Sequence, residues 1–212
     1  MGPPVMAITP EAARTELAQA NIPYTQEALV SHVEKGNMEV VGWFLAIGME
    51  VDASNEFGET GLMLASEQGH LEMVQLLLVN KADVKARDLA KRTALMNAAQ
   101  NGHTGIVKLL LEWGAGVNAA SQWKSTALHE ASMNGHYDVV HKLLNSGADI
   151  KMINNAGNTA LVEAIIECQE SIIRLLISRG ADVNARDLSG HSTGETPLMV
   201  AAMRGKTDIA AV

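Results

Sequence analysis

The sequence predicts an all-α solenoid, a linear stack of short helix–turn–helix units, on the strength of three recurring series of residues. One turn series repeats every 33 positions: Gly36, Gly69, Gly102, Gly135 and Cys168. A leucine series keeps the same step: Leu29, Leu62, Leu95, Leu128 and Leu161. A second turn series does so too: Gly48, Lys81, Gly114, Gly147 and Gly180. A fixed period of this size indicates stacked repeats, each burying its apolar face on its neighbours.

The composition fits thin helical layers better than one deep core. Of the 212 residues, 47% are hydrophobic but only 3% are aromatic, and 18 are glycine. We therefore expect one elongated array instead of one or two globular domains. A net charge of −8, without a run of Lys or Arg, argues against nucleic acid and anionic membranes as partners.

The single cysteine, Cys168, excludes an internal disulfide framework and a cysteine-based zinc site. Residues 1–20 lack the basic and then apolar segments of a signal peptide. No apolar run reaches the roughly 18 residues that a membrane span requires. We therefore expect a cytoplasmic protein.

The first element expected is a capping helix. Thr9 offers an N-cap oxygen, Pro10 fits the first turn, and Glu11 favours the positive end of a helix. Good helix formers follow until residues 21–23 stop the helix. This stretch matches no repeat, so residues 1–22 are interpreted as a tail and an N-terminal cap over the first unit.

Each following unit is expected to contain two short helices and a loop. Residues 60–68 form one helix that ends at Gly69, residues 71–79 form a second, more apolar helix, and residues 55–58 lie in the preceding loop. Helices of this length are not stable alone, so each must bury its face on a neighbouring unit. The expected units are 23–54, 55–87, 88–120, 121–153, 154–186 and a partial unit at 187–212.

Several segments carry a family resemblance. The fourth unit reads TALHEA at 126–131, NGH at 134–136 and GADI at 147–150, and the fifth closes with GADVNA at 180–185. These segments resemble the signature of ankyrin repeats, over roughly residues 25–212. The resemblance implies helix pairs joined by projecting β-hairpin loops. It also implies a concave face, formed by the loop tips and the first helices, that binds other proteins.

The units depart from that signature in places. Only the fourth unit has both Thr126 and His129 in its opening motif. The other units hold apolar residues where His129 stands: Met63, Met96, Val162 and Met199. The sixth unit has four extra residues within 190–194, at a loop tip where insertions are tolerated. The sequence stops at Val212, within the second helix of that unit, so we expect a mobile C-terminal end capable of self-association.

Two turn positions hold side chains where the other units have glycine. These residues are Lys81 and Cys168. Glycine is favoured at such turns because they need a positive φ. We therefore predict left-handed backbone geometry at both residues, at a cost of about 1 kcal/mol each.

The motifs that suggest chemistry have simpler explanations. The segment GAGVNA at 114–119 spells a dinucleotide fingerprint, but it follows a helix instead of a strand. His70, His103 and His136 occur once per unit, too far apart to share a metal ion, and we expect their rings to hydrogen-bond to local backbone. The sequence thus predicts no catalytic residue, no cofactor and no metal site.

Equivalent positions along the repeats predict a partner site on the concave face. A row near the ends of the first helices changes from acidic to apolar: Glu34, Glu67, Gln100, Met133, Ile166 and Met203. A row at the loop tips contains two aromatic residues: Phe57, Ala90, Trp123, Ala156 and Ser189. Exposed apolar side chains of this kind mark interaction sites. For Met133 and Ile166 the alternative is packing between helices. We expect Trp123 to be the anchor, with Phe57 as an outlying contact and these residues around the anchor: Leu89, Arg92, Ser125, Met133 and Ile166.

The sequence therefore predicts a non-catalytic scaffold or adaptor that binds a protein partner. An alternative is a regulatory or targeting domain of a longer, possibly enzymatic chain that continues past Val212. A freestanding enzyme is disfavoured, because a solenoid offers an extended surface and no enclosed pocket.

Overall fold

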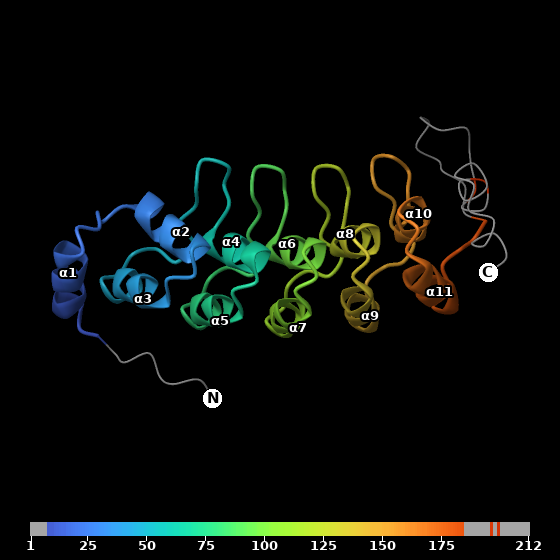
Figure 1. Cartoon of the computed structure of the whole chain (residues 1–212). Helices are drawn as coiled ribbons and strands as arrows, with labels where there is room; N and C mark the ends of the chain where they lie inside the picture. Colours follow the sequence, from blue (N-terminus) through green and yellow to red (C-terminus); the bar gives the residue numbers. More distant parts are fainter. Residues whose placement is uncertain (1–7, 185–195, 197–198, 200–212) are drawn as a thin grey trace.

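The computed structural model describes residues 8–184 together with Thr196 and Met199. Within this part of the chain eleven helices follow one another and no strand forms. The helices are α1 Pro10–Gln19, α2 Gln26–Glu34, α3 Met38–Ala46, α4 Gly61–Gln68, α5 Leu71–Val79, α6 Ala94–Gln100, α7 Thr104–Glu112, α8 Ala127–Met133, α9 Tyr137–Asn145, α10 Ala160–Ile166 and α11 Glu170–Ser178. The predicted all-helical stack is confirmed, and Figure 1 shows it as an elongated array.

The helices lie in two rows (Figure 1). Helices α2, α4, α6, α8 and α10 form the first row, from which loops project, and α3, α5, α7, α9 and α11 form the second. Each first-row helix packs on the next one and on the second-row helix that follows it. Helix α1 packs against α3, with Ala13 and Leu17 fully buried. The capping helix therefore covers the N-terminal end of the stack.

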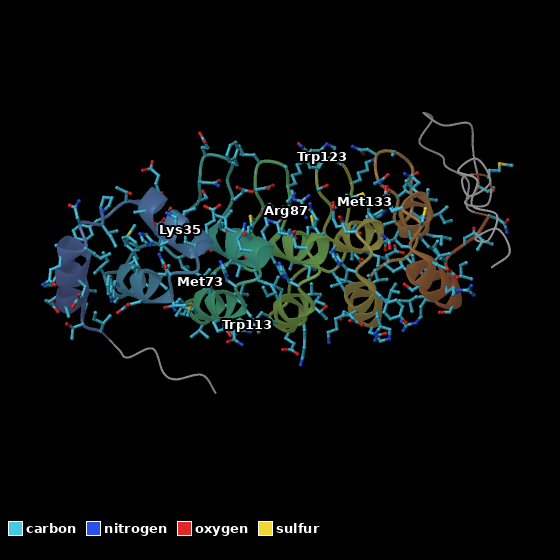
Figure 2. All side chains as sticks on the ribbon, viewed as in Figure 1. Lys35, Met73, Arg87, Trp113, Trp123 and Met133 are labelled. Carbon is cyan, nitrogen blue, oxygen red and sulfur yellow. The ribbon has the colours of Figure 1, made fainter. Side chains whose placement is uncertain are left out.

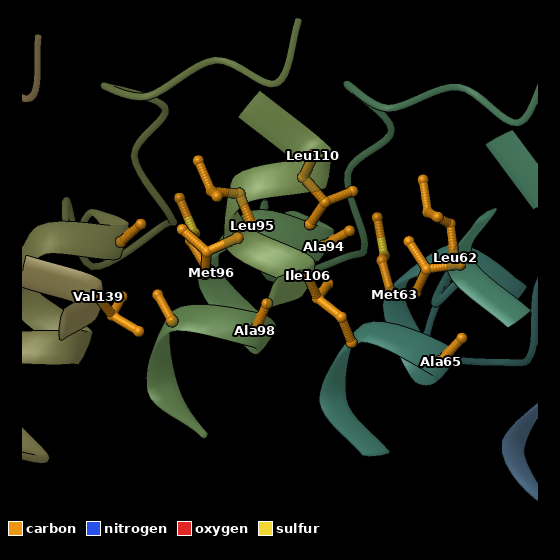
Figure 3. Packing of buried hydrophobic residues seen from close by; sticks show 14 of the residues in the cluster. Leu62, Met63, Ala65, Ala94, Leu95, Met96, Ala98, Ile106, Leu110 and Val139 are labelled. Carbon is orange, nitrogen blue, oxygen red and sulfur yellow. The ribbon is translucent and has the colours of Figure 1, made fainter. Parts of the chain in front are cut away.

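The core is continuous along the array because each unit contributes equivalent apolar residues. All five members of the leucine series are at most 2% exposed. Met63 and Met96, which occupy the position of His129, are each 1% exposed. Figure 3 shows Met63 and Met96 within the row of packed apolar side chains, with Ile106 on the side of Met63 and Val139 on the side of Met96. Apolar contact thus replaces the imidazole in these units, as the sequence predicts.

The two turn predictions are confirmed. Lys81 has φ of 70° and Cys168 has φ of 61°, both in the left-handed region. A third series of such positions, which the sequence did not predict, lies at the loop tips, where Lys91 and Lys124 have φ of 59° and 56°. Lysine thus adopts a conformation that costs a non-glycine residue roughly 1–2 kcal/mol at several turns.

The imidazoles after the first helices bond across units instead of locally, which corrects the expectation for them. The Nε2–H groups of His70, His103 and His136 donate to backbone oxygens of the preceding unit at 3.1, 2.9 and 2.9 Å. The acceptors belong to the end of the preceding first helix, 36 residues earlier: Glu34, Glu67 and Gln100. Sequence neighbours could not reveal these partners, because only the stacking of units brings them together.

The projecting loops are closed by tight turns and not by a regular strand ladder. In the described part of the chain the β pairing is one isolated antiparallel bridge between Ser54 and Thr60. The four extra residues at 190–194 and the second helix of the sixth unit lie outside the described residues. The expectations of a mobile C-terminal end and of self-association therefore stay predictions.

Candidate interaction surface

The loops carry their side chains on a fixed backbone. Each loop is closed at its tip by a backbone hydrogen bond, such as Ser121 N–H to the Ser125 oxygen at 2.9 Å. Neighbouring loops are also joined: Leu89 N–H donates to Phe57 O at 3.0 Å, and Asn155 N–H donates to Trp123 O at 2.8 Å. We call the surface formed by residues 54–60, 87–93, 120–126 and 153–159 with the first-row helices the finger face.

Three of the predicted site residues expose large apolar side chains at the loop tips. Phe57, Leu89 and Trp123 are 60%, 74% and 50% exposed. Figure 2 shows Trp123 on a projecting loop and Met133 at the first-row helix α8. Ile166 is half-buried at the end of α10, which matches the packing alternative better than an open contact.

A groove between the fourth and fifth units brings three predicted residues together. Trp123, Ser125 and Met133 line it, and its volume is about 500 Å³. The remaining lining comes from both sides of the groove: His129, Glu130, Asn154, Asn155, Ala156 and Glu163. Leu89, Arg92 and Ile166 do not line this groove, so the predicted cluster is divided over several units.

Arg92 is tied within the protein. Its guanidinium donates to Asn97 Oδ1 at 3.1 Å and to Gln100 Oε1 at 2.5 Å, and it lies 3.7 Å from a carboxylate oxygen of Glu130. The Glu130 side chain is 9% exposed and that of Arg92 is 20% exposed. Arg92 thus links the third and fourth units, and the predicted contact of Arg92 with a partner stays a prediction.

His129 forms the buried floor of the groove. Thr126 N–H donates to its Nδ1 at 3.3 Å, which places the ring proton on Nε2, and Nε2–H donates to Asn158 O at 3.1 Å. Burial lowers the pKa of this imidazole below its usual value, and nearby Glu163 and Glu130 oppose the shift in part. The ring is therefore held neutral by its surroundings and spans two units.

A second groove lies between the first and second units. Its volume is about 530 Å³, and Phe57 forms part of its wall. Four carboxylates stand around it: Glu27, Glu34, Glu56 and Glu59. Val30, Ser31, Asn55 and Leu64 complete the lining. The sequence analysis treated Phe57 as an outlying contact and did not detect this groove, although the acidic start of the first-helix row was a signal for it.

Neither groove presents the side chains of a metal centre. Among the residues that the structure describes, no group of three His, Cys, Asp or Glu side chains could hold a metal ion. In the same part of the chain, no helix is both long and apolar enough to cross a bilayer. The two grooves instead present apolar and acidic side chains.

A comparison with protein families identifies the repeats. A family model that describes three copies of the ankyrin repeat matches residues 28–121 and, a second time, residues 114–187. The chain belongs to the ankyrin repeat family. Ankyrin repeats are generally protein–protein interaction modules, and their fold is generally non-catalytic. A comparison with curated proteins finds no match to this ankyrin repeat chain.

Proposed function

We propose that this ankyrin repeat protein is a non-catalytic scaffold or adaptor that binds one protein partner on its finger face, in the cytoplasm. The binding site is centred on the groove between the fourth and fifth units. Trp123 is its anchor, Ser125 and Met133 form the adjoining surface, and Leu89 lies at its edge.

The observation that supports this proposal is the combination of exposure and rigidity at Trp123. Half of the side chain is exposed, yet Trp123 N–H donates to Ser121 Oγ at 3.2 Å and its carbonyl accepts from Asn155. Because these bonds already fix the backbone that carries the ring, little backbone conformational entropy is lost when a partner covers it. Aromatic anchors beside a groove dominate the energetics of many interfaces.

The test compares two tryptophans of similar exposure. Trp113, 47% exposed, caps the C-terminus of α7 beside the second row, whereas Trp123 lies on a loop (Figure 2). Proteins captured from cell extract by the wild type are purified, and each is titrated with the wild type, Trp113→Ala and Trp123→Ala. We expect Trp123→Ala to weaken binding by roughly 2 kcal/mol or more, about 30-fold.

Two results would count against the proposal. Equal affinity of the wild type and Trp123→Ala for the purified partner would show that the anchor is misplaced. A large loss of thermal stability in Trp123→Ala, comparable to that of Leu128→Ala, would show that Trp123 supports the fold. Leu128 is 1% exposed and serves as the folding control.

A further inference from the structure

The two grooves of the finger face are lined largely by equivalent positions of the repeats. Seven lining residues of the first groove lie 99 residues, or three repeats, before seven lining residues of the second. The equivalent pairs are Val30 and His129, Ser31 and Glu130, Glu34 and Met133, Asn55 and Asn154, Glu56 and Asn155, Phe57 and Ala156, and Leu64 and Glu163. The grooves differ in these substitutions and in the projecting loop that carries Trp123 and Ser125, because no such loop precedes α2 (Figure 1).

The substitutions give the outer surfaces of the two grooves opposite character. Glu34 and Glu56 of the first groove are exposed, and both correspond to uncharged residues in the second, Met133 and Asn155. The carboxylates of the second groove are committed instead. Glu130 lies by Arg92, and Glu163 accepts from Asn154 and Asn158. The second groove thus presents an apolar opening, and the first an acidic one.

The acidic groove lies in the most acidic part of the repeats. Residues 23–87 contain ten Asp and Glu but four Lys and Arg, a net charge of −6 out of the −8 of the whole chain. Residues 88–153 contain five acidic and six basic residues, a net charge of +1. An excess of one sign over a concave, partly desolvated lining attracts ligand groups of the opposite sign.

The carboxylates of the first groove are open to a partner. Glu59 accepts from Asn55 Nδ2 at 2.7 Å. Glu27, Glu34 and Glu56 form no ion pair within the described part of the chain. Among the residues that line this groove there is no lysine or arginine. A guanidinium entering it would meet carboxylates at several edges and could stack on the exposed ring of Phe57.

The middle of the finger face has the opposite charge. Lys91 and Lys124 stand exposed at the tips of the loops between the two grooves, where the outer loops have Gly58 and Gly157. Like charges facing each other across an interface disfavour binding, so a basic partner segment is excluded from this middle region.

We infer that the partner is a protein segment with two separated anchors, an arginine-containing basic end and an apolar end. This inference rests on the proposed function and specifies the partner's chemistry. The basic end occupies the groove of Glu34, Glu56 and Phe57, and the apolar end occupies the groove of Trp123 and Met133. The lysines between the grooves favour this orientation, because the reverse placement would put the basic end beside Lys124 and the apolar end among the exposed carboxylates of Glu34 and Glu56.

The spacing of the anchors follows from the stacking of the helices. Packed helices lie roughly 8–10 Å apart, so three repeats separate the grooves by about 24–30 Å. An extended chain advances about 3.3 Å per residue, so the anchors stand about seven to nine residues apart in an extended segment. A helical segment would need about 16–20 residues for the same distance.

The test is a selection of phage-displayed random 16-residue peptides on the immobilised protein. We expect wild-type selections to enrich peptides in which Arg or Lys precedes or follows a large apolar residue by seven to nine positions. The charge-reversed variant Glu34→Lys/Glu56→Lys should enrich Asp or Glu at the charged position instead. Phe57→Ala should lower the preference for Arg over Lys several-fold, and Trp123→Ala should remove the apolar preference while keeping the basic one.

The outcomes separate this inference from the proposed function. Selections without basic enrichment, selections unchanged by the charge reversal, or no enriched peptides would each overturn the two-anchor inference. The capture experiment with Trp123→Ala and Trp113→Ala judges the proposed function independently. Apolar enrichment that depends on Trp123 but lacks a basic anchor would preserve the proposed function while refuting the inference. Circular dichroism of each variant shows that the stack is intact.

Discussion

Replacing Gly102 by alanine tests whether cross-unit histidines hold the stack together. A Cβ at Gly102 would lie 2.5 Å from Nδ1 of His136, closer than any real contact of this kind. The imidazole would have to move, and its 2.9 Å hydrogen bond to Gln100 O would break. Gly114→Ala is a matched control, because Gly114 has φ of 88° against 73° for Gly102 but no atom within 4 Å of the added Cβ.

The expected magnitudes follow from these two differences. Both alanines meet left-handed strain of roughly 1–2 kcal/mol. Gly102→Ala additionally leaves a half-buried carbonyl and an imidazole without their partners, which costs about 1–3 kcal/mol more. We therefore expect the free energy of unfolding to fall by about 2–5 kcal/mol for Gly102→Ala and about 1–2 kcal/mol for Gly114→Ala.

Urea denaturation followed by far-UV circular dichroism measures both losses under the same conditions. The double variant Gly102→Ala/His136→Ala separates the two causes further, because removal of the ring removes the clash. Equal losses for Gly102→Ala and Gly114→Ala would refute the reasoning, since the cost would then come from the backbone and not from the ring of the next unit.

Three further predictions concern the turns, the buried histidine and the core. Lys81→Gly and Cys168→Gly relieve left-handed strain and should each stabilise by up to about 1 kcal/mol, measured by thermal unfolding; a loss at both would contradict the strain argument. The pKa of His129 is lowered in the folded protein, so the unfolded chain binds the proton more tightly. The contribution of neutral His129 to the free energy of unfolding should be fully present above pH 6.5 and should decrease as the pH falls below 6.5. His129→Met, which introduces the residue found at position 96, should flatten this pH dependence of the free energy of unfolding, and an unchanged slope would refute the argument. Leu128→Ala should cost about 2–5 kcal/mol in urea denaturation, and a cost under 1 kcal/mol would mean that the site relaxes around the cavity.

The candidate site could be predicted only in part, for a physical reason that Arg92 illustrates. Its position in the loop, equivalent to Glu59 and Ser125, indicates which face it belongs to, because equivalent residues of a repeat occupy equivalent positions. The row does not show that Glu130, 38 residues later, is within 3.7 Å of its guanidinium. The side chain of Trp123 is not covered by another unit in this way and remains exposed, so its role as an anchor stays a prediction.

The 33-residue period by itself determined the helix pairs, the buried leucines and the left-handed turns at Lys81 and Cys168. Each of these features depends on local backbone geometry and on contact with a neighbouring unit of the same fold. The tertiary structure decided how the units are joined and which surface stays open. The bonds of His103 and His136 to the preceding unit, and the acidic and apolar grooves, arise where side chains from different repeats meet. Such meetings depend on the distance and rotation between units, which a repeat period does not specify.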